Sequence, residues 1–110
     1  MSNDNVRARN RGKAWERRVA EILGGFRPRG GNRGMAGSDV GGVPWAIECT
    51  RTAQMWRRLR PKWEQASVNA EREGKEPVLI AARPRQRWQD ALVVMLLELF
   101  QSLTRGDEDA

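Results

Sequence analysis

Apolar residues recur at helical spacing near the start of the chain, and they mark the first predicted helix. The stripe consists of Trp15, Val19, Ile22 and Leu23. Spacings of three and four residues place such side chains on one face of a helix, which we predict over residues 11–23. Gly24 and Gly25 follow at once and are expected to end it. The polar, basic residues 1–10 carry no such stripe and are predicted to form a flexible arm.

Alternating apolar and polar residues predict a strand over residues 44–50. Successive side chains of a strand point to opposite faces, so this strand has an apolar face and a more polar one. The first face carries Trp45, Ile47 and Cys49, and the second carries Ala46, Glu48 and Thr50. Gly41 and Gly42 form a turn before this strand, which suggests a hairpin whose first arm includes Asp39.

The rest of the chain continues this alternation of helical and strand patterns. A second helix is predicted from the low fifties to Glu73, with Pro61 as a point where it can break and Gly74 as its end. The further predicted elements are a basic glycine-rich loop over 27–38, a buried strand over 77–83, a basic turn over 83–87, a strand over 88–95 and a closing helix over 96–103. This order predicts an α/β fold with a small mixed central β-sheet flanked by helices.

Length and charge narrow the class of protein. The 110 residues suit one domain, which we place at residues 11–105, followed by an acidic tail over 106–110. Lys and Arg number 20 against 14 Asp and Glu, a net charge of +6, and removing the three acids of the tail leaves +9 on the rest. Such a charge attracts polyanions, and nucleic acid is the first candidate. The alternative is a soluble protein whose many arginines reflect a genome of high GC content.

Several kinds of site are excluded by residue types that the chain lacks. It contains no histidine, which excludes histidine-ligated zinc and Ser-His-Asp triads. Cys49 is the only cysteine, so an internal disulfide is excluded and a reducing cytoplasm is expected. Its place on the apolar face predicts a core residue rather than a nucleophile. No apolar run is long enough to cross a membrane, so no membrane partner is expected.

Two acids form the candidate catalytic centre. Glu48 interrupts an otherwise apolar strand, and a buried acid is costly unless it is paired or binds metal. Asp39 precedes that strand by a short loop and is expected to reach the same end of it. Two converging carboxylates with oxygen ligands only suit Mg²⁺ or Mn²⁺. The alternatives are a turn role for Asp39 and a solvent-exposed strand face for Glu48.

The spacing of these motifs resembles a known nuclease group. The matching segments are Gly-Ser-Asp39, Ile47-Glu48-Cys49-Thr50 and, on the first helix, Gly12-Lys13-Ala14-Trp15-Glu16-Arg17-Arg18. Together they resemble the PD-(D/E)XK nuclease superfamily, and within it archaeal-type Holliday-junction resolvases and their phage relatives, over residues 10–95. The resemblance implies a restriction-endonuclease-like core and metal-dependent cleavage of branched DNA. It also implies a homodimer working in the cytoplasm of a prokaryote or of a phage-infected cell.

The resemblance also implies a role for individual residues. Metal would be held by Asp39, Glu48 and the carbonyl of Cys49, assisted by Glu16. The implied contacts to DNA are Arg17 on the first helix and one of Arg29 and Arg33 in the loop. The residues themselves add Arg27, because all three loop arginines lie among glycines that let the backbone approach a phosphate, and Arg51 after the strand is a further predicted DNA contact. Gln65 matches a glutamine on the following helix in some branches of the family.

Thr50 departs from the family pattern, which places a lysine at this position. Threonine carries no positive charge, so the cation would have to come from another element. Lys62 and Arg51 are the candidates, although Arg51 belongs to the opposite face of the strand. The other readings are a catalytically impaired, nuclease-like DNA-binding protein and an endonuclease that cuts or nicks ordinary duplex.

Overall fold

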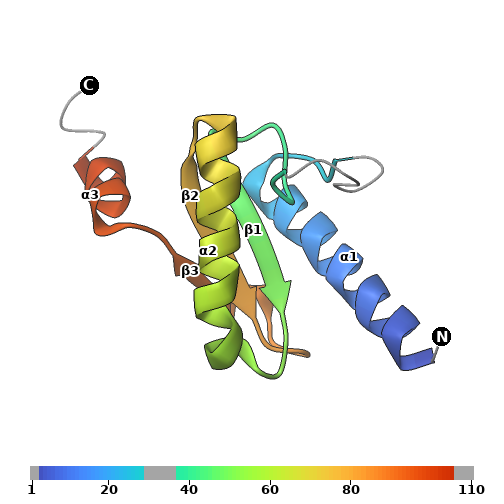
Figure 1. The fold of residues 1–110 in the computed structure, drawn as a ribbon. Coiled ribbons are helices and arrows are strands. Elements are labelled where there is room, and N and C mark those ends of the chain that lie inside the picture. Colours follow the sequence, from blue (N-terminus) through green and yellow to red (C-terminus); the bar gives the residue numbers. More distant parts are fainter. Residues whose placement is uncertain (1–2, 29–36, 106–110) are drawn as a thin grey trace.

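The computed structural model describes residues 3–28 and 37–105, which form an α/β fold (Figure 1). Within these residues three helices accompany a three-stranded mixed sheet, as the sequence predicted in outline. The elements in chain order are α1 (Asn3–Leu23), β1 (Trp45–Arg51), α2 (Met55–Glu73), β2 (Glu76–Ala82), a 3-10 turn (Trp88–Asp90), β3 (Leu92–Val94) and α3 (Leu97–Arg105). The predicted acidic tail and most of the predicted glycine-rich loop lie outside the described residues.

The sheet has the strand order β1-β2-β3, so β1 lies at one edge and β3 at the other. β1 and β2 are parallel, with Glu48 opposite Leu79. β3 runs antiparallel to β2, with Val93 opposite Ile80. A parallel pair needs a crossover connection, which α2 provides here.

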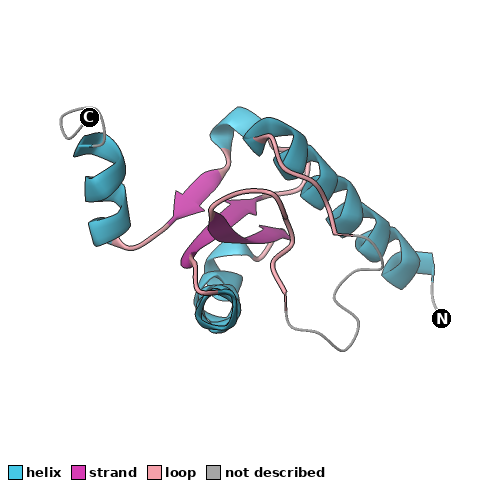
Figure 2. Ribbon diagram, turned by 90° about the horizontal axis from the view of Figure 1, so that it is seen from above, coloured by secondary structure: helices cyan, strands magenta, loops and turns pink. Residues whose placement is uncertain are grey.

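Helices cover both faces of the sheet, with α1 on one side and α2 on the other (Figure 2). The alternation predicted for the first strand is confirmed. Ile47 and Cys49 belong to a core cluster with Trp15 and Val19 of α1, whereas Glu48 points to α2. Because helices bury both faces of β1, the prediction of a solvent-exposed face for Glu48 is wrong.

The first helix begins earlier than predicted, at Asn3 rather than near Arg11. Residues 3–10 contain neither glycine nor proline, and their arginines and alanine are good helix formers. The backbone therefore stays helical through most of the segment predicted as a flexible arm. The second helix also continues through Pro61 without a break, and it ends on Gly74 in the left-handed conformation, as predicted.

The predicted hairpin is reduced to single bridges. Val40 pairs with Ile47, and Phe26 pairs with Gly41, outside any regular strand. A Cβ on Gly25 would lie 2.3 Å from the Gly41 carbonyl oxygen, so the two backbones approach more closely than other residues allow. The predicted strand over 88–95 is shortened to β3 because the residues before it turn, with hydrogen bonds from Asp90 and Ala91 back to Arg87 and Trp88.

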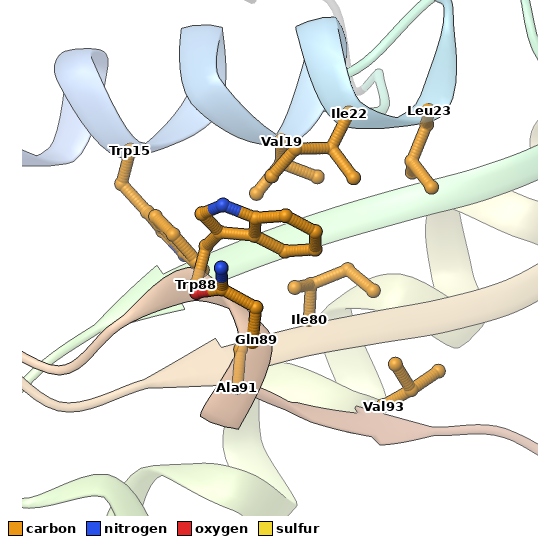
Figure 3. Close-up of a pocket in the computed structure, with 9 residues that line it drawn as sticks. All are labelled: Trp15, Val19, Ile22, Leu23, Ile80, Trp88, Gln89, Ala91 and Val93. Atoms are coloured by element: carbon orange, nitrogen blue, oxygen red, sulfur yellow. The ribbon is translucent and has the colours of Figure 1, made fainter.

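The C-terminal part of the fold contains an apolar hollow and a largely exposed helix, of which Leu99 packs against the core. A cavity of about 200 Å³ opens between α1 and strands β2 and β3 (Figure 3). Its lining residues are Trp15, Val19, Ile22, Leu23, Ile80, Trp88, Gln89, Ala91 and Val93, none of which is charged. Beyond β3, no residue of α3 is buried. None of the helices in the part of the chain described is both long and apolar enough to cross a bilayer.

Candidate active site

Asp39 lies along the edge of β1 that faces away from β2, in the segment that bridges to β1 through Val40 and Ile47. Its backbone N–H donates to the Ile47 carbonyl at 2.8 Å, and its carboxylate Oδ2 accepts from the Cys49 N–H at 2.8 Å. Backbone and side chain are thus both tied to the strand. The predicted approach of Asp39 to β1 is confirmed, and the carboxylate is fixed rather than free to turn into solvent.

The C-terminal half of α2 holds the segment that carries Asp39. The Glu73 carboxylate accepts from the Ser38 N–H at 2.9 Å and from the Ser38 hydroxyl at 2.6 Å. Asn69, which is buried, donates to the Gly37 carbonyl at 3.2 Å. The sequence interpretation missed these contacts, although Asn69 and Glu73 are spaced one helical turn apart and therefore share a face.

Glu48 and Lys62 meet between β1 and α2. Lys62 Nζ lies 3.8 Å from Glu48 Oε1. Glu48 is only 3% exposed, and its other oxygen, Oε2, is buried without a hydrogen-bond partner. The Lys62 side chain is 29% exposed, so it reaches the buried acid from the solvent side. Of the two replacement cations considered, the structure therefore brings Lys62 to the acids.

Burial of the two carboxyl groups shifts both pKa values upwards. Desolvation raises the pKa of Glu48 to about 8, and the neighbouring charge of Asp39 adds to this shift. Desolvation also raises the pKa of Asp39, to about 6, against the lowering effect of the Cys49 N–H bond. Lys62 lowers both pKa values and Glu16 raises both. Near neutral pH the pair therefore retains a proton, which a bound cation could replace.

Glu16 reaches the same region from α1 and forms an ion pair with Arg27. Arg27 Nε lies 2.8 Å from Glu16 Oε2, and both side chains are 23% exposed. The charge of Glu16 is close enough to raise the pKa of Asp39 and Glu48. The structure thus brings Glu16 towards the acids as predicted. Arg27, predicted as a DNA contact, is engaged with Glu16.

Arg51 is not at this site. Its guanidinium lies over the Trp15 ring, 5.0 Å from the centroid, on the face that α1 covers. It donates to the carbonyls of Arg83 and Gln86 at 3.2 and 3.0 Å. Arg51 as replacement for the missing lysine is therefore wrong, because one step along a strand reverses the direction of the side chain.

The remaining predicted residues differ in their exposure. Thr50 is buried on the same face as Glu48 and brings no charge to it. Arg17 on α1 and Gln65 on α2 are exposed to solvent, and Arg29 and Arg33 lie outside the described residues. Burial raises the pKa of the Cys49 thiol. Cys49 is therefore a protonated core residue, as predicted.

The acids fit a hard cation that retains water ligands. No group of three or more His, Cys, Asp or Glu side chains within residues 3–28 and 37–105 is arranged to hold a metal. Mg²⁺ needs only one or two protein carboxylates, because it keeps several waters. Asp39 and Glu48 supply two, and the Cys49 carbonyl faces the same edge as its N–H, since both groups of a strand residue point to one side. The orphaned Oε2 of Glu48 is a further free ligand atom.

Comparison with protein-family models, with curated proteins and with solved structures finds no match to this chain.

Proposed function

We propose that this protein is a metal-dependent endonuclease that hydrolyses phosphodiester bonds in DNA, built on a restriction-endonuclease-like core. The observation that carries the proposal is the Lys62 ammonium 3.8 Å from the buried carboxylate of Glu48. Thr50 deprives the strand of the expected lysine, and α2 supplies a lysine to the same acid. An acid pair with a neighbouring cation is the arrangement that phosphodiester chemistry requires.

Each residue then has a distinct role. Asp39, Glu48 and the Cys49 carbonyl would hold Mg²⁺ or Mn²⁺, which when bound supplies an activated water and stabilises phosphate charge. The hydrogen bond from the Cys49 N–H keeps Asp39 pointed at the strand edge. Lys62 places a positive charge beside the acids, where it can neutralise a phosphate oxygen of the substrate. The Glu16–Arg27 pair borders the acids on the α1 side.

The proposed substrate is branched DNA, and the proposed active form is a homodimer. Both follow from the likeness to Holliday-junction resolvases. Two features of the fold support the homodimer: β3 is an unpaired sheet edge, and α3 beyond it exposes Leu97 and Phe100, which are 79% and 53% accessible. A two-fold dimer would place two sites against the symmetric strands of a four-way junction.

A second candidate is a DNA-binding protein that keeps the fold without the chemistry. Thr50 favours it, because the strand lacks a cation at the expected place. In that case Lys62 would only neutralise a buried acid. The two candidates make opposite predictions for the same set of variants.

The test is cleavage of a labelled synthetic four-way junction beside a matched linear duplex, in Mg²⁺, in Mn²⁺ and in EDTA. We expect symmetric, metal-dependent cutting of the junction by the unaltered chain. Lys62→Met should slow it by about a hundredfold or more, whereas Lys13→Met, an exposed lysine on α1, should not. Junction binding without cutting, with activity gained in Thr50→Lys, would instead establish the binding protein. Equal cutting of both substrates would identify a duplex endonuclease.

A further inference from the structure

A basic surface lies at the carboxyl ends of the two parallel strands, β1 and β2. These ends are adjacent, because Arg51 pairs with Ala82 and the Thr52 N–H donates to the Ala82 carbonyl at 3.0 Å. β2 continues there into residues 83–87, in which three of five side chains are exposed arginines: Arg83, Arg85 and Arg87. The first turn of α2 begins beside them and contains no acid. We call residues 83–87 the arginine loop.

Arg51, the last residue of β1, holds the arginine loop in place. Its guanidinium donates to the carbonyls of Arg83 and Gln86, at 3.2 and 3.0 Å, while stacking on Trp15. The Gln86 side-chain oxygen accepts from the Arg83 N–H at 2.9 Å. The carbonyls at both ends of the turn are thus occupied by the protein itself. The loop is held in one shape before any partner arrives, which lowers the entropic cost of binding.

Arg85 occupies the tip of the loop in a strained conformation. Its φ is +64°, in the left-handed region that residues other than glycine rarely adopt. Among the described residues all other positive φ values belong to glycines. Asn or Gly would fit this backbone with less strain than arginine. Such outliers cluster where a side chain contacts a ligand.

A hollow of about 320 Å³ lies between the arginine loop and α1, lined by Ala14, Arg51, Pro84 and Arg85. Ala14 and Pro84 have small, uncharged side chains, whereas Arg51 and Arg85 carry guanidinium groups. Guanidinium groups offer paired N–H donors that match the oxygens of a phosphate. The hollow and the loop together therefore suit an anionic, oxygen-rich ligand.

We propose that the arginine loop and its hollow bind the phosphodiester backbone of duplex DNA at the carboxyl ends of β1 and β2. The inference rests on the proposed function for its choice of DNA. Arg51 and Glu48 are three positions apart on β1, about 10 Å along a strand, and their side chains point to opposite faces of the sheet. Arg51 itself acts as a positioning residue, because its guanidinium donors hold the loop's carbonyls.

The test measures binding of a short DNA duplex in EDTA over a range of salt concentrations, so that cleavage plays no part. The slope of log K against log salt should decrease in magnitude by about 0.9 for each arginine that contacts a phosphate. We expect this for Arg85→Gly, and about twice the effect for Arg83→Gln and Arg85→Gly combined, since Arg87 is already paired with Asp90 at 3.2 Å. Arg85→Gly should leave the melting temperature unchanged or higher, because glycine tolerates the positive φ.

Arg72→Gln is the matched control, since it removes an exposed arginine from the opposite end of α2. The proposal is overturned if the combined variant has the same salt slope as the unaltered chain, or if Arg72→Gln changes it equally. Tighter binding of an RNA duplex of the same sequence would overturn the assignment to DNA. None of these outcomes alters the junction-cleavage test with Lys62→Met, so the two proposals fail separately.

Discussion

At the scale of single residues, the fold brings a buried acid and a cation together from distant parts of the sequence. The alternation of apolar and polar residues along β1 was sufficient to predict that Glu48 and Cys49 face opposite ways. The same alternation placed Arg51 away from the acids. From the sequence, Lys62 was one of two candidates for the missing cation. The direction of its side chain depends on where α2 begins and how that helix crosses the sheet. Neither quantity is encoded in a local pattern.

Protonation of the acid pair predicts how stability depends on pH. The pKa values of Glu48 and Asp39 are raised on folding, so the folded chain binds protons more tightly than the unfolded chain. This stabilisation is complete below the unfolded pKa values, near pH 4, and is lost as pH rises towards 8.

The measurement is thermal unfolding in EDTA at a series of pH values. The melting temperature should fall between about pH 5 and pH 8, and Glu48→Gln should flatten this dependence because an amide does not titrate. Mg²⁺ added at the upper end should raise the melting temperature, since a cation that binds only the folded state stabilises it. A melting temperature that rises with pH over this range would contradict the assigned pKa shifts.

At the scale of elements, the contact between α2 and the Asp39 segment decides whether the site is assembled. Sequence patterns predicted α2, β1 and β2 closely, because α2 and β1 have clear apolar periods and β2 is a continuous apolar run. The bridged segment before β1 was predicted as a regular strand arm. It differs because the close approach of Gly25 and Gly41 leaves room for only isolated pairs. The contacts that hold it come from Asn69 and Glu73, far along the chain, and such long-range pairings leave no periodic signal.

Removing the Glu73 carboxylate should therefore disturb both stability and catalysis. Glu73→Ala leaves the Ser38 N–H and hydroxyl without their acceptor, which should cost about 1–3 kcal/mol. It should also reduce junction cleavage, because Asp39 adjoins Ser38. Urea unfolding and cleavage rates would be compared with Glu71→Ala, an exposed acid on the same helix. Because the two groups are in contact, Ser38→Ala combined with Glu73→Ala should cost less than the sum of the single changes.

At the scale of the whole molecule, the described residues place the buried acids at one edge of the sheet and exposed apolar residues at the other. The acids lie at the β1 edge, and most of the exposed large apolar residues lie between Trp88 and Leu103, in or around β3 and α3 at the other edge of the sheet. Figure 1 shows α3 standing apart from the two helices that cover the sheet. The sequence predicted a closing helix over 96–103, and α3 occupies nearly the same residues. The sequence could not show whether other parts of the chain cover the apolar residues of α3, because that depends on where the helix lies after β3.

The apolar edge predicts a dimer formed by two copies of this chain. Antiparallel pairing of β3 with its counterpart would satisfy its free backbone groups about a two-fold axis. The segment Ala91–Met95 has no charge to oppose such pairing. Sedimentation should therefore give twice the chain mass of 12.5 kDa. Phe100→Asp, which places a charge among the apolar residues of α3, should shift the mass to that of one chain.

Ser102→Asp is the control for that change, because it adds the same charge to α3 at an exposed position one helical turn after Glu98. It should leave the dimer intact. A single-chain mass for the unaltered protein at every concentration would contradict the homodimer while leaving the acid site untouched. If Phe100→Asp gives one chain that still cuts a junction on one strand only, the two sites act independently, and the dimer serves to make the two cuts coincide.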